Sequence, residues 1–130
     1  KMILLLSALI VLLIPGTMVL FGYVWKKHPP KTINGIYGYR TRRSMQNWAT
    51  WEFAHQYCAR LWRKLGCITA AASVLVLLPF LSLAEDTLML AAAILTFLQM
   101  FPLLLSIIPV EAALKRNFDE YGVPRQNPSV

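Results

Sequence analysis

Three long apolar runs constrain the possible folds of this chain more than any other feature. They cover residues 2–25, 65–83 and 87–110, and none contains a charged side chain. At about 1.5 Å per helical residue, each can cross roughly 30 Å of hydrocarbon. Hydrophobic residues make up 57% of the chain and charged residues only 15%, against about 25% in soluble domains. The sequence therefore predicts an all-α integral membrane bundle of three transmembrane helices, as one domain over residues 1–130.

The first apolar run has some features of a secretory signal, because Lys1 precedes it. The run continues past Pro15 and Gly16 to Trp25, however, without an A-x-A-like cleavage site. We therefore expect a retained transmembrane helix. Since Lys1 is not an initiating Met, the sequence leaves the true N-terminus open.

The distribution of charge between the spans predicts their orientation. Short loops rich in Lys and Arg stay on the cytoplasmic side of a membrane. The connection 26–64 is rich in both and contains one acidic residue, Glu52, whereas the short second connection contains Glu85 and Asp86. We therefore expect loop 26–64 and tail 111–130 in the cytoplasm and the N-terminus outside. The net charge of +7 suits anionic lipid headgroups, so the bilayer is the expected partner and nucleic acid is not.

A helix is predicted over residues 45–64, with Ser44 as its N-cap. Its aromatic face contrasts with a polar, basic opposite face. Such a helix suits the headgroup region, so we predict an interfacial amphipathic helix between the first and second spans. The alternative is that its aromatic face packs on neighbouring transmembrane helices. That face carries Trp48, Trp51, His55, Cys58 and Trp62.

Residues 34–51, NGIYGYRTRRSMQNWATW, form a polar and aromatic motif between the first two spans. It consists of an Asn, a G-Y-R-T element, and then Ser, Asn and T-W: Asn34, Gly38, Tyr39, Arg40, Thr41, Ser44, Asn47, Thr50 and Trp51.

In these residues the chain resembles the SdpI family of bacterial membrane proteins, named for an immunity protein that protects a producing cell from its own secreted toxic peptide. Three spans and a basic tail are similar to the family's short members, and Glu111 corresponds to an acidic position after the last span. Two residues depart from the pattern. Arg42 stands where Pro is frequent, and His55 where Asn is common.

The resemblance implies a non-enzymatic protein of the bacterial inner membrane that protects against, or senses, a secreted antimicrobial peptide. Its partner would be a peptide toxin or another membrane protein. The alternative is a small accessory subunit of a larger membrane complex. No cofactor is expected. Glu52, His55 and Cys58 lack a visible oxyanion donor, and the two His and two Cys residues are not in metal-ligand spacing.

Two interpretations of Arg40 stay open. Its planar fork of donors suits a phosphate, a peptide carboxylate or carbonyl oxygens of a partner. Alternatively, Arg40 pairs with Glu111 and clamps the loop to the bundle. Glu111 also precedes Lys115 by four residues, which favours a local helical ion pair.

Within the apolar runs, Gln99 is the most polar group, and its amide requires a partner on another helix or subunit. Small residues at 70–73 and 91–93 predict a tight hairpin of the last two spans, or a homo-oligomer. Cys58 and Cys67 would lie about 13 Å apart on a helix, too far for a disulfide. After residue 110 we expect a short basic helix and then an irregular, mobile end containing prolines.

Overall fold

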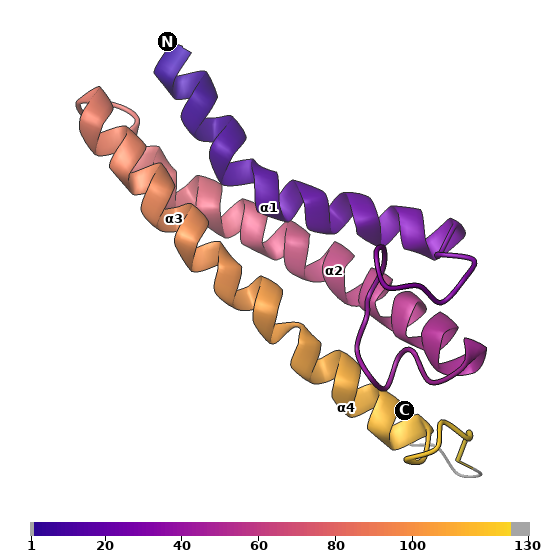
Figure 1. Cartoon of the computed structure of the whole chain (residues 1–130). Coiled ribbons are helices and arrows are strands. Elements are labelled where there is room, and N and C mark those ends of the chain that lie inside the picture. Colours follow the sequence, from indigo (N-terminus) through magenta and orange to yellow (C-terminus); the bar gives the residue numbers. More distant parts are fainter. Residues whose placement is uncertain (1, 126–130) are drawn as a thin grey trace.

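The computed structural model describes residues 2–125, and these residues form an all-helical fold (Figure 1). The only β-type pairing in this part of the chain is an isolated bridge between Phe118 and Pro124. The prediction of an all-α protein is confirmed. The elements are α1 (Met2–Lys27), α2 (Trp48–Leu77), the 3-10 turn η1 (Leu78–Phe80), α3 (Glu85–Leu105) and α4 (Ile107–Asn117).

Three helical segments are long and apolar enough to cross a membrane, in agreement with the three predicted spans. They are Met2–Lys27, Trp48–Phe80 and Glu85–Asn117, the last comprising α3 and α4. The first ends just before Pro29 and Pro30, because proline lacks the amide hydrogen that a helix needs and disfavours helical geometry in the preceding residue.

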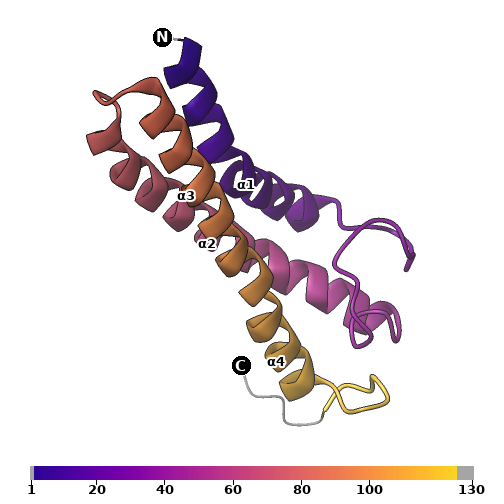
Figure 2. The same cartoon turned by 60° about the vertical axis from the view of Figure 1, so that its left-hand side comes forward.

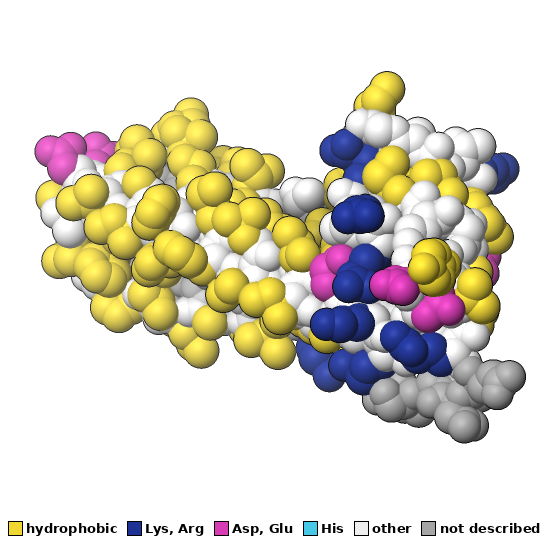
Figure 3. All heavy atoms as spheres, turned by 60° about the horizontal axis from the view of Figure 1, so that its bottom comes forward, with side chains coloured by type: hydrophobic (Ala, Val, Ile, Leu, Met, Phe, Trp, Pro, Cys, Tyr) yellow, Lys and Arg dark blue, Asp and Glu magenta, His cyan; other side chains and the backbone are white. Residues whose placement is uncertain are grey.

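The long helices run side by side, with the turn between α2 and α3 near the N-terminus (Figures 1 and 2). The loop that joins α1 to α2 and the end of α4 lie at the opposite end. In the face shown in Figure 3, hydrophobic side chains cover one half of the molecule, while basic side chains gather at the other. This separation is the surface expected of a helical bundle with one charged end in water.

The predicted interfacial helix over residues 45–64 is not found as a separate element. The helix starts at Trp48 and continues without a break to Leu77. The reason is local, since no proline interrupts residues 48–77, and Gly66 alone does not end the helix. Its N-cap is Asn47 rather than Ser44. Most of the aromatic face packs inside the protein, the alternative that the sequence left open. Trp51, His55 and Cys58 are fully buried, whereas Trp48 in the first turn of the helix is 45% exposed.

α1 and α2 form the closest helix pair, and two glycines permit their approach. A Cβ atom on Gly22 of α1 would lie 2.5 Å from Cγ of Arg63 and 2.9 Å from the carbonyl oxygen of Ala59. One on Gly66 of α2 would lie 2.9 Å from the carbonyl oxygen of Pro15. These glycines bring α1 close to α2, whereas the sequence predicted the tight approach between the last two spans. Ser73 and Ala92, from the two stretches of small residues behind that prediction, are buried.

A polar node joins the three spans in the middle of the bundle. Proline at position 15 cannot donate to the carbonyl oxygen of Val11, four residues earlier. Nε2 of Gln99 in α3 donates to that carbonyl at 2.7 Å and also lies 2.8 Å from Oγ of Ser73 in α2. The predicted interhelical contact of Gln99 is confirmed, and its acceptor is the carbonyl that Pro15 leaves free.

The third span bends between α3 and α4 at Ser106, whose hydroxyl accepts a 3.0 Å hydrogen bond from Nε1 of Trp62 in α2. α4 carries Lys115 and Arg116 in its last turn, so the expected basic helix is present, but it begins at Ile107 and forms the last part of the third span rather than following it. Residues 118–125 then form turns against the loop end of the bundle. The end expected to be mobile falls on residues 126–130, outside the described part of the chain.

Candidate functional site

The first half of the motif is a tight loop held by its own side chains. Oδ1 of Asn34 accepts hydrogen bonds from the amides of Ile36 and Tyr37 at 2.9 and 2.7 Å. Nη1 of Arg40 donates to the carbonyl oxygen of Gly35 at 2.6 Å. Asn34 and Arg40 thus close the loop from both sides and set the position of Ile36 at its tip, where 89% of that side chain is exposed.

Gly38 turns the loop back into the bundle. Its φ of +117° is costly for any residue with a Cβ atom, and such an atom would also lie 2.7 Å from Nε2 of His55. The turn directs the amide of Tyr39 at the same Nε2, which accepts it at 2.8 Å. Nδ1 of His55 therefore carries the ring proton and donates to the carbonyl oxygen of Trp51 at 2.7 Å.

The indole of Trp51 packs beneath this turn. It is completely buried, and its Nε1 donates to the carbonyl oxygen of Pro30 at 3.0 Å. Its ring centroid lies 4.4 Å from that of His55. Trp51 therefore ties the end of α1 to the start of α2 beneath the loop.

Thr41 and Ser44 build the turn that follows Tyr39. Oγ of Ser44 accepts from the amide of Thr41 at 2.8 Å and lies 3.0 Å from the carbonyl oxygen of Tyr39, to which it donates. The predicted role of Ser44 as a helix cap is wrong, because these loop groups occupy its hydroxyl.

Asn47 and Thr50 cap α2 reciprocally. Oδ1 of Asn47 accepts from the amide of Thr50 at 2.9 Å, and Oγ1 of Thr50 accepts from the amide of Asn47 at 3.1 Å. Nδ2 of Asn47 also donates to the carbonyl oxygen of Gly122 at 2.8 Å, which fastens the residues after α4 to the motif. Gly122 has a φ of +79° and no room for a side chain beside Asn47.

Glu111, near the start of α4, is the point where the third span meets the motif. Its Oε2 accepts hydrogen bonds from the hydroxyl of Tyr39 at 2.6 Å and from Oγ1 of Thr41 at 2.8 Å. Nε of Arg43 lies 4.0 Å from Oε1. The loop is therefore clamped to the bundle through Glu111, but Tyr39, Thr41 and Arg43 form the clamp rather than the expected Arg40. The expected ion pair of Glu111 with Lys115 on the same helix is not found between these two described residues.

The hydrogen bond to Glu111 affects the titration of Tyr39. The phenol ring is buried, and burial disfavours the phenolate. The negative carboxylate of Glu111 disfavours it further. Burial first, and Glu111 second, raise the pKa of Tyr39 above its ordinary value. Tyr39 is therefore a stable hydrogen-bond donor at physiological pH.

An apolar groove of about 540 Å³ lies beside the loop tip. Its walls come from α1, the loop, α2 and α3. Nε1 of Trp25 donates to the hydroxyl of Tyr37 at 2.9 Å and so fixes the loop against α1. The groove is lined, among others, by Phe21, Trp25, Ile36, Tyr37, Trp62 and Leu103.

The structure brings the predicted site residues together, with the exception of Arg40. Gly38, Tyr39, Thr41, Ser44, Thr50, Trp51 and Glu111 form a connected core beneath the loop, with Asn34 and Asn47 at its ends. Arg40 is exposed and bonds only within the loop. His55 is not among the predicted site residues, yet it accepts the central hydrogen bond, from the amide of Tyr39. Its spacing of four residues from Trp51 on the aromatic face is the sequence signal for this position.

The family model described as the SdpI/YfhL protein family matches residues 31–110. The chain belongs to the SdpI/YfhL family. The resemblance inferred from the motif is thereby confirmed, and the match includes the loop and all of α2 and α3. SdpI/YfhL membership and three apolar helices together make this a membrane protein.

A relative of known sequence supports the SdpI/YfhL assignment. "Uncharacterized protein YfhL" of Bacillus subtilis (strain 168) is 40% identical over 83 residues, which cover 64% of this chain and 74% of the relative. No solved structure matches the chain. SdpI/YfhL is not a known enzyme family. Among residues 2–125, no three His, Cys, Asp or Glu side chains are grouped to hold a metal ion.

Proposed function

We propose that this protein is a non-enzymatic immunity or sensing factor of the bacterial inner membrane that recognises a secreted antimicrobial peptide. The observation that carries the proposal is that one loop supplies both a wall of the apolar groove, through residues 36–38, and the exposed Arg40, which is bound to the carbonyl oxygen of Gly35. An antimicrobial peptide that partitions into the bilayer reaches such a groove from the membrane. Membership in the SdpI/YfhL family supports this reading, because the family takes its name from an immunity protein.

Arg40 is the motif residue best suited to contact a ligand. The polar side chains that the family motif places around it, Asn34, Tyr39, Ser44 and Asn47, are engaged in bonds that fold the loop. Arg40 spends one donor on the carbonyl oxygen of Gly35 and retains further donors of its guanidinium group on an exposed surface. A peptide carboxylate would satisfy those donors while apolar side chains occupy the groove.

The test is protection of a sensitive bacterium that expresses the protein and is challenged with candidate peptides. Wild type is compared with Arg40→Ala and with the control Arg42→Ala, which removes the same charge from another exposed position of the loop. We expect Arg42→Ala to protect and Arg40→Ala to lose protection at equal membrane abundance. Equal protection by both variants, or no protection by wild type against any peptide, contradicts the proposal for those peptides.

We also propose that the basic end faces the cytoplasm and the N-terminus faces outward. The support is the concentration of Lys and Arg at the loop end, opposite Glu85 and Asp86. Arg42→Cys in a Cys67→Ser background, in which the buried Cys58 is the other cysteine, tests this orientation. A membrane-impermeant thiol reagent should label position 42 only after the cells are opened.

An accessory subunit of a larger complex is the second candidate. It is favoured by an exposed aromatic pair on α3, Phe97 and Phe101, whose ring centroids lie 5.7 Å apart in an edge-to-face arrangement. Such a pair suits the surface of a partner helix. Purification in mild detergent discriminates the two candidates, since a stoichiometric large partner supports the subunit and a protein isolated alone or as a self-dimer supports the immunity factor.

A further inference from the structure

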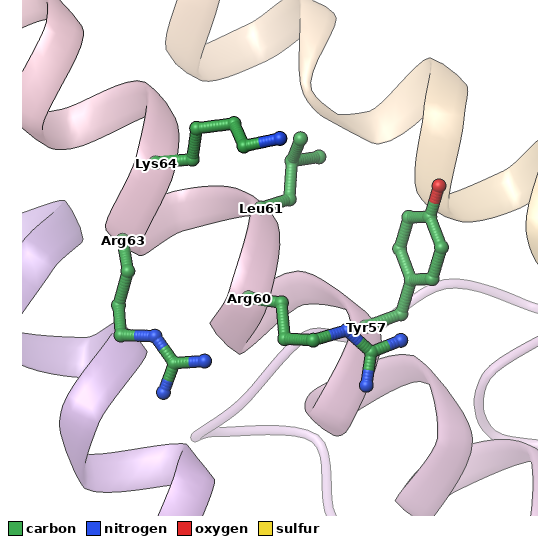
Figure 4. A pocket seen from close by; sticks show the side chains of 5 residues that line it. All are labelled: Tyr57, Arg60, Leu61, Arg63 and Lys64. Atoms are coloured by element: carbon green, nitrogen blue, oxygen red, sulfur yellow. The ribbon is translucent and has the colours of Figure 1, made fainter.

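A basic hollow of about 340 Å³ lies on α2, away from the motif loop (Figure 4). Arg60, Arg63 and Lys64 supply its charge, and their spacing of three and four residues places them on one side of the helix. Tyr57 and Leu61 complete the lining, so no acidic side chain neutralises the hollow. Its electrostatic character favours a ligand with negative charge.

The position of the hollow along α2 defines its depth in the membrane. Lys64 is the last charged residue before the uncharged residues 65–83. The apolar part of the helix runs on from there to Phe80. Its length of about 24 Å, at about 1.5 Å per residue, covers most of the roughly 30 Å of the hydrocarbon layer. The hollow therefore lies where the apolar part begins, at the level of the lipid phosphates on the basic side of the protein.

Arg63 has a donor that the protein leaves unused. Its stem packs against Gly22 of α1, and its guanidinium group lies 5.5 Å from the ring centroid of Tyr23. Within residues 2–125, Nη1 of Arg63 is buried and has no hydrogen-bond acceptor. Buried guanidinium donors are normally paired, and a phosphate oxygen is a strong acceptor for them. Arg60 is held over the ring of Tyr57 at 5.7 Å, on the other side of the hollow.

We propose that this hollow binds the headgroup phosphate of an anionic phospholipid. Arg63 would turn its guanidinium group toward the hollow and so bring the buried Nη1 to the phosphate. Arg60 and Lys64 would balance the charge, and the acyl chains would lie along the apolar part of α2. A phospholipid is the occupant that combines a phosphate with chains of the required apolar character at this depth. This site is independent of the peptide recognition proposed above, because it shares no lining residue with the apolar groove.

The experiment measures thermal unfolding of the purified full chain in micelles containing phosphatidylglycerol, phosphatidylcholine, or inorganic phosphate without added lipid. The test variant is Arg60→Gln with Lys64→Gln, since both side chains are exposed and their loss should leave the fold intact. The control is Lys26→Gln with Lys27→Gln, which removes two exposed charges from the same end of the bundle. Helical circular dichroism verifies that both variants are folded.

We expect phosphatidylglycerol to raise the unfolding temperature of wild type and control by several degrees more than phosphatidylcholine does. The test variant should lose at least half of that difference. Arg63→Lys, which keeps the charge and removes the fork, should reduce it as well. Equal losses in test variant and control would overturn the proposal in favour of diffuse attraction. Equal stabilisation by inorganic phosphate and phosphatidylglycerol would overturn the assignment to lipid.

Discussion

The hydroxyl of Tyr39 donates a 2.6 Å hydrogen bond to the carboxylate of Glu111, which lies 72 residues later in the chain. This bond joins the loop after the first span to the end of the third. The amide of the same tyrosine is bound by His55 of the second span. Tyr39 thus contacts a polar group from each of the two later spans, and the shape of the loop depends on how the bundle is assembled.

Removal of the phenol hydroxyl in Tyr39→Phe should destabilise the protein by about 1.5 kcal/mol, as typical for a hydrogen bond to a charged group. The measurement is a double-mutant cycle with Glu111→Gln, followed by chemical unfolding in detergent micelles. Because the two groups share one bond, the double variant should be less destabilised than the sum of the single variants. Additive effects would show that the bond contributes nothing to stability.

Alkaline pH should weaken the same contact. The pKa of Tyr39 is raised in the folded protein, so the stability contributed by the neutral phenol is complete below its unfolded pKa of about 10 and decreases as pH rises toward the folded pKa. Phenolate absorbance compared between wild type and Tyr39→Phe should show that Tyr39 ionises above its ordinary range. If the absorbance difference between the two proteins instead shows that Tyr39 ionises at about pH 10, the unperturbed pKa of tyrosine, the pKa of Tyr39 is not raised.

Gly38→Ala should destabilise the protein by about 2 kcal/mol or more. A positive φ is strained for alanine, and its Cβ atom would overlap with the ring of His55. Gly35→Ala is the matched control in the same loop, since a Cβ atom there has no neighbour within 4 Å. Limited proteolysis of the loop and thermal unfolding should both separate the two variants. Similar behaviour of the pair would mean that the turn adapts to a side chain.

Gln99→Leu should cost about 1 kcal/mol, within the range measured for polar contacts between transmembrane helices. The substitution leaves the carbonyl oxygen of Val11 without the donor that replaces the missing amide hydrogen of Pro15. Thr96→Ala serves as control, because Thr96 bonds to Ala92 within its own helix. Unfolding by a denaturing detergent, followed by circular dichroism, measures both. If Gln99→Leu proves as stable as wild type, the node does not hold the spans together.

Gly66→Val should separate α1 from α2 and destabilise the bundle by about 2 kcal/mol, in the range observed for overpacked cores. The added Cβ atom would lie 2.6 Å from Cγ2 of Val19 and 2.9 Å from the carbonyl oxygen of Pro15. Gly16→Ala is the control on the facing helix, where no atom lies within 4 Å. That variant should keep or increase stability, because alanine favours helix over glycine. Thermal unfolding in one detergent compares the two directly.

Several features of the fold could be predicted from the sequence because they depend on local composition. The uncharged runs require lipid, and lipid requires helices whose backbone bonds are internal. Pro29 and Pro30 end the first helix for a covalent reason. The motif from Asn34 to Trp51 consists of residue types at fixed spacing, so the sequence is sufficient to indicate the family.

The pairing of side chains, in contrast, was decided by the tertiary structure. Arg40 and Arg43 are equally charged and three positions apart, and only the direction of the turn after Gly38 brings Arg43 rather than Arg40 to Glu111. Asn47 replaces Ser44 as the cap because the loop already occupies the Ser44 hydroxyl. Composition and spacing determine which segments leave water, whereas hydrogen bonds between distant residues depend on directions that exist only once the helices have packed.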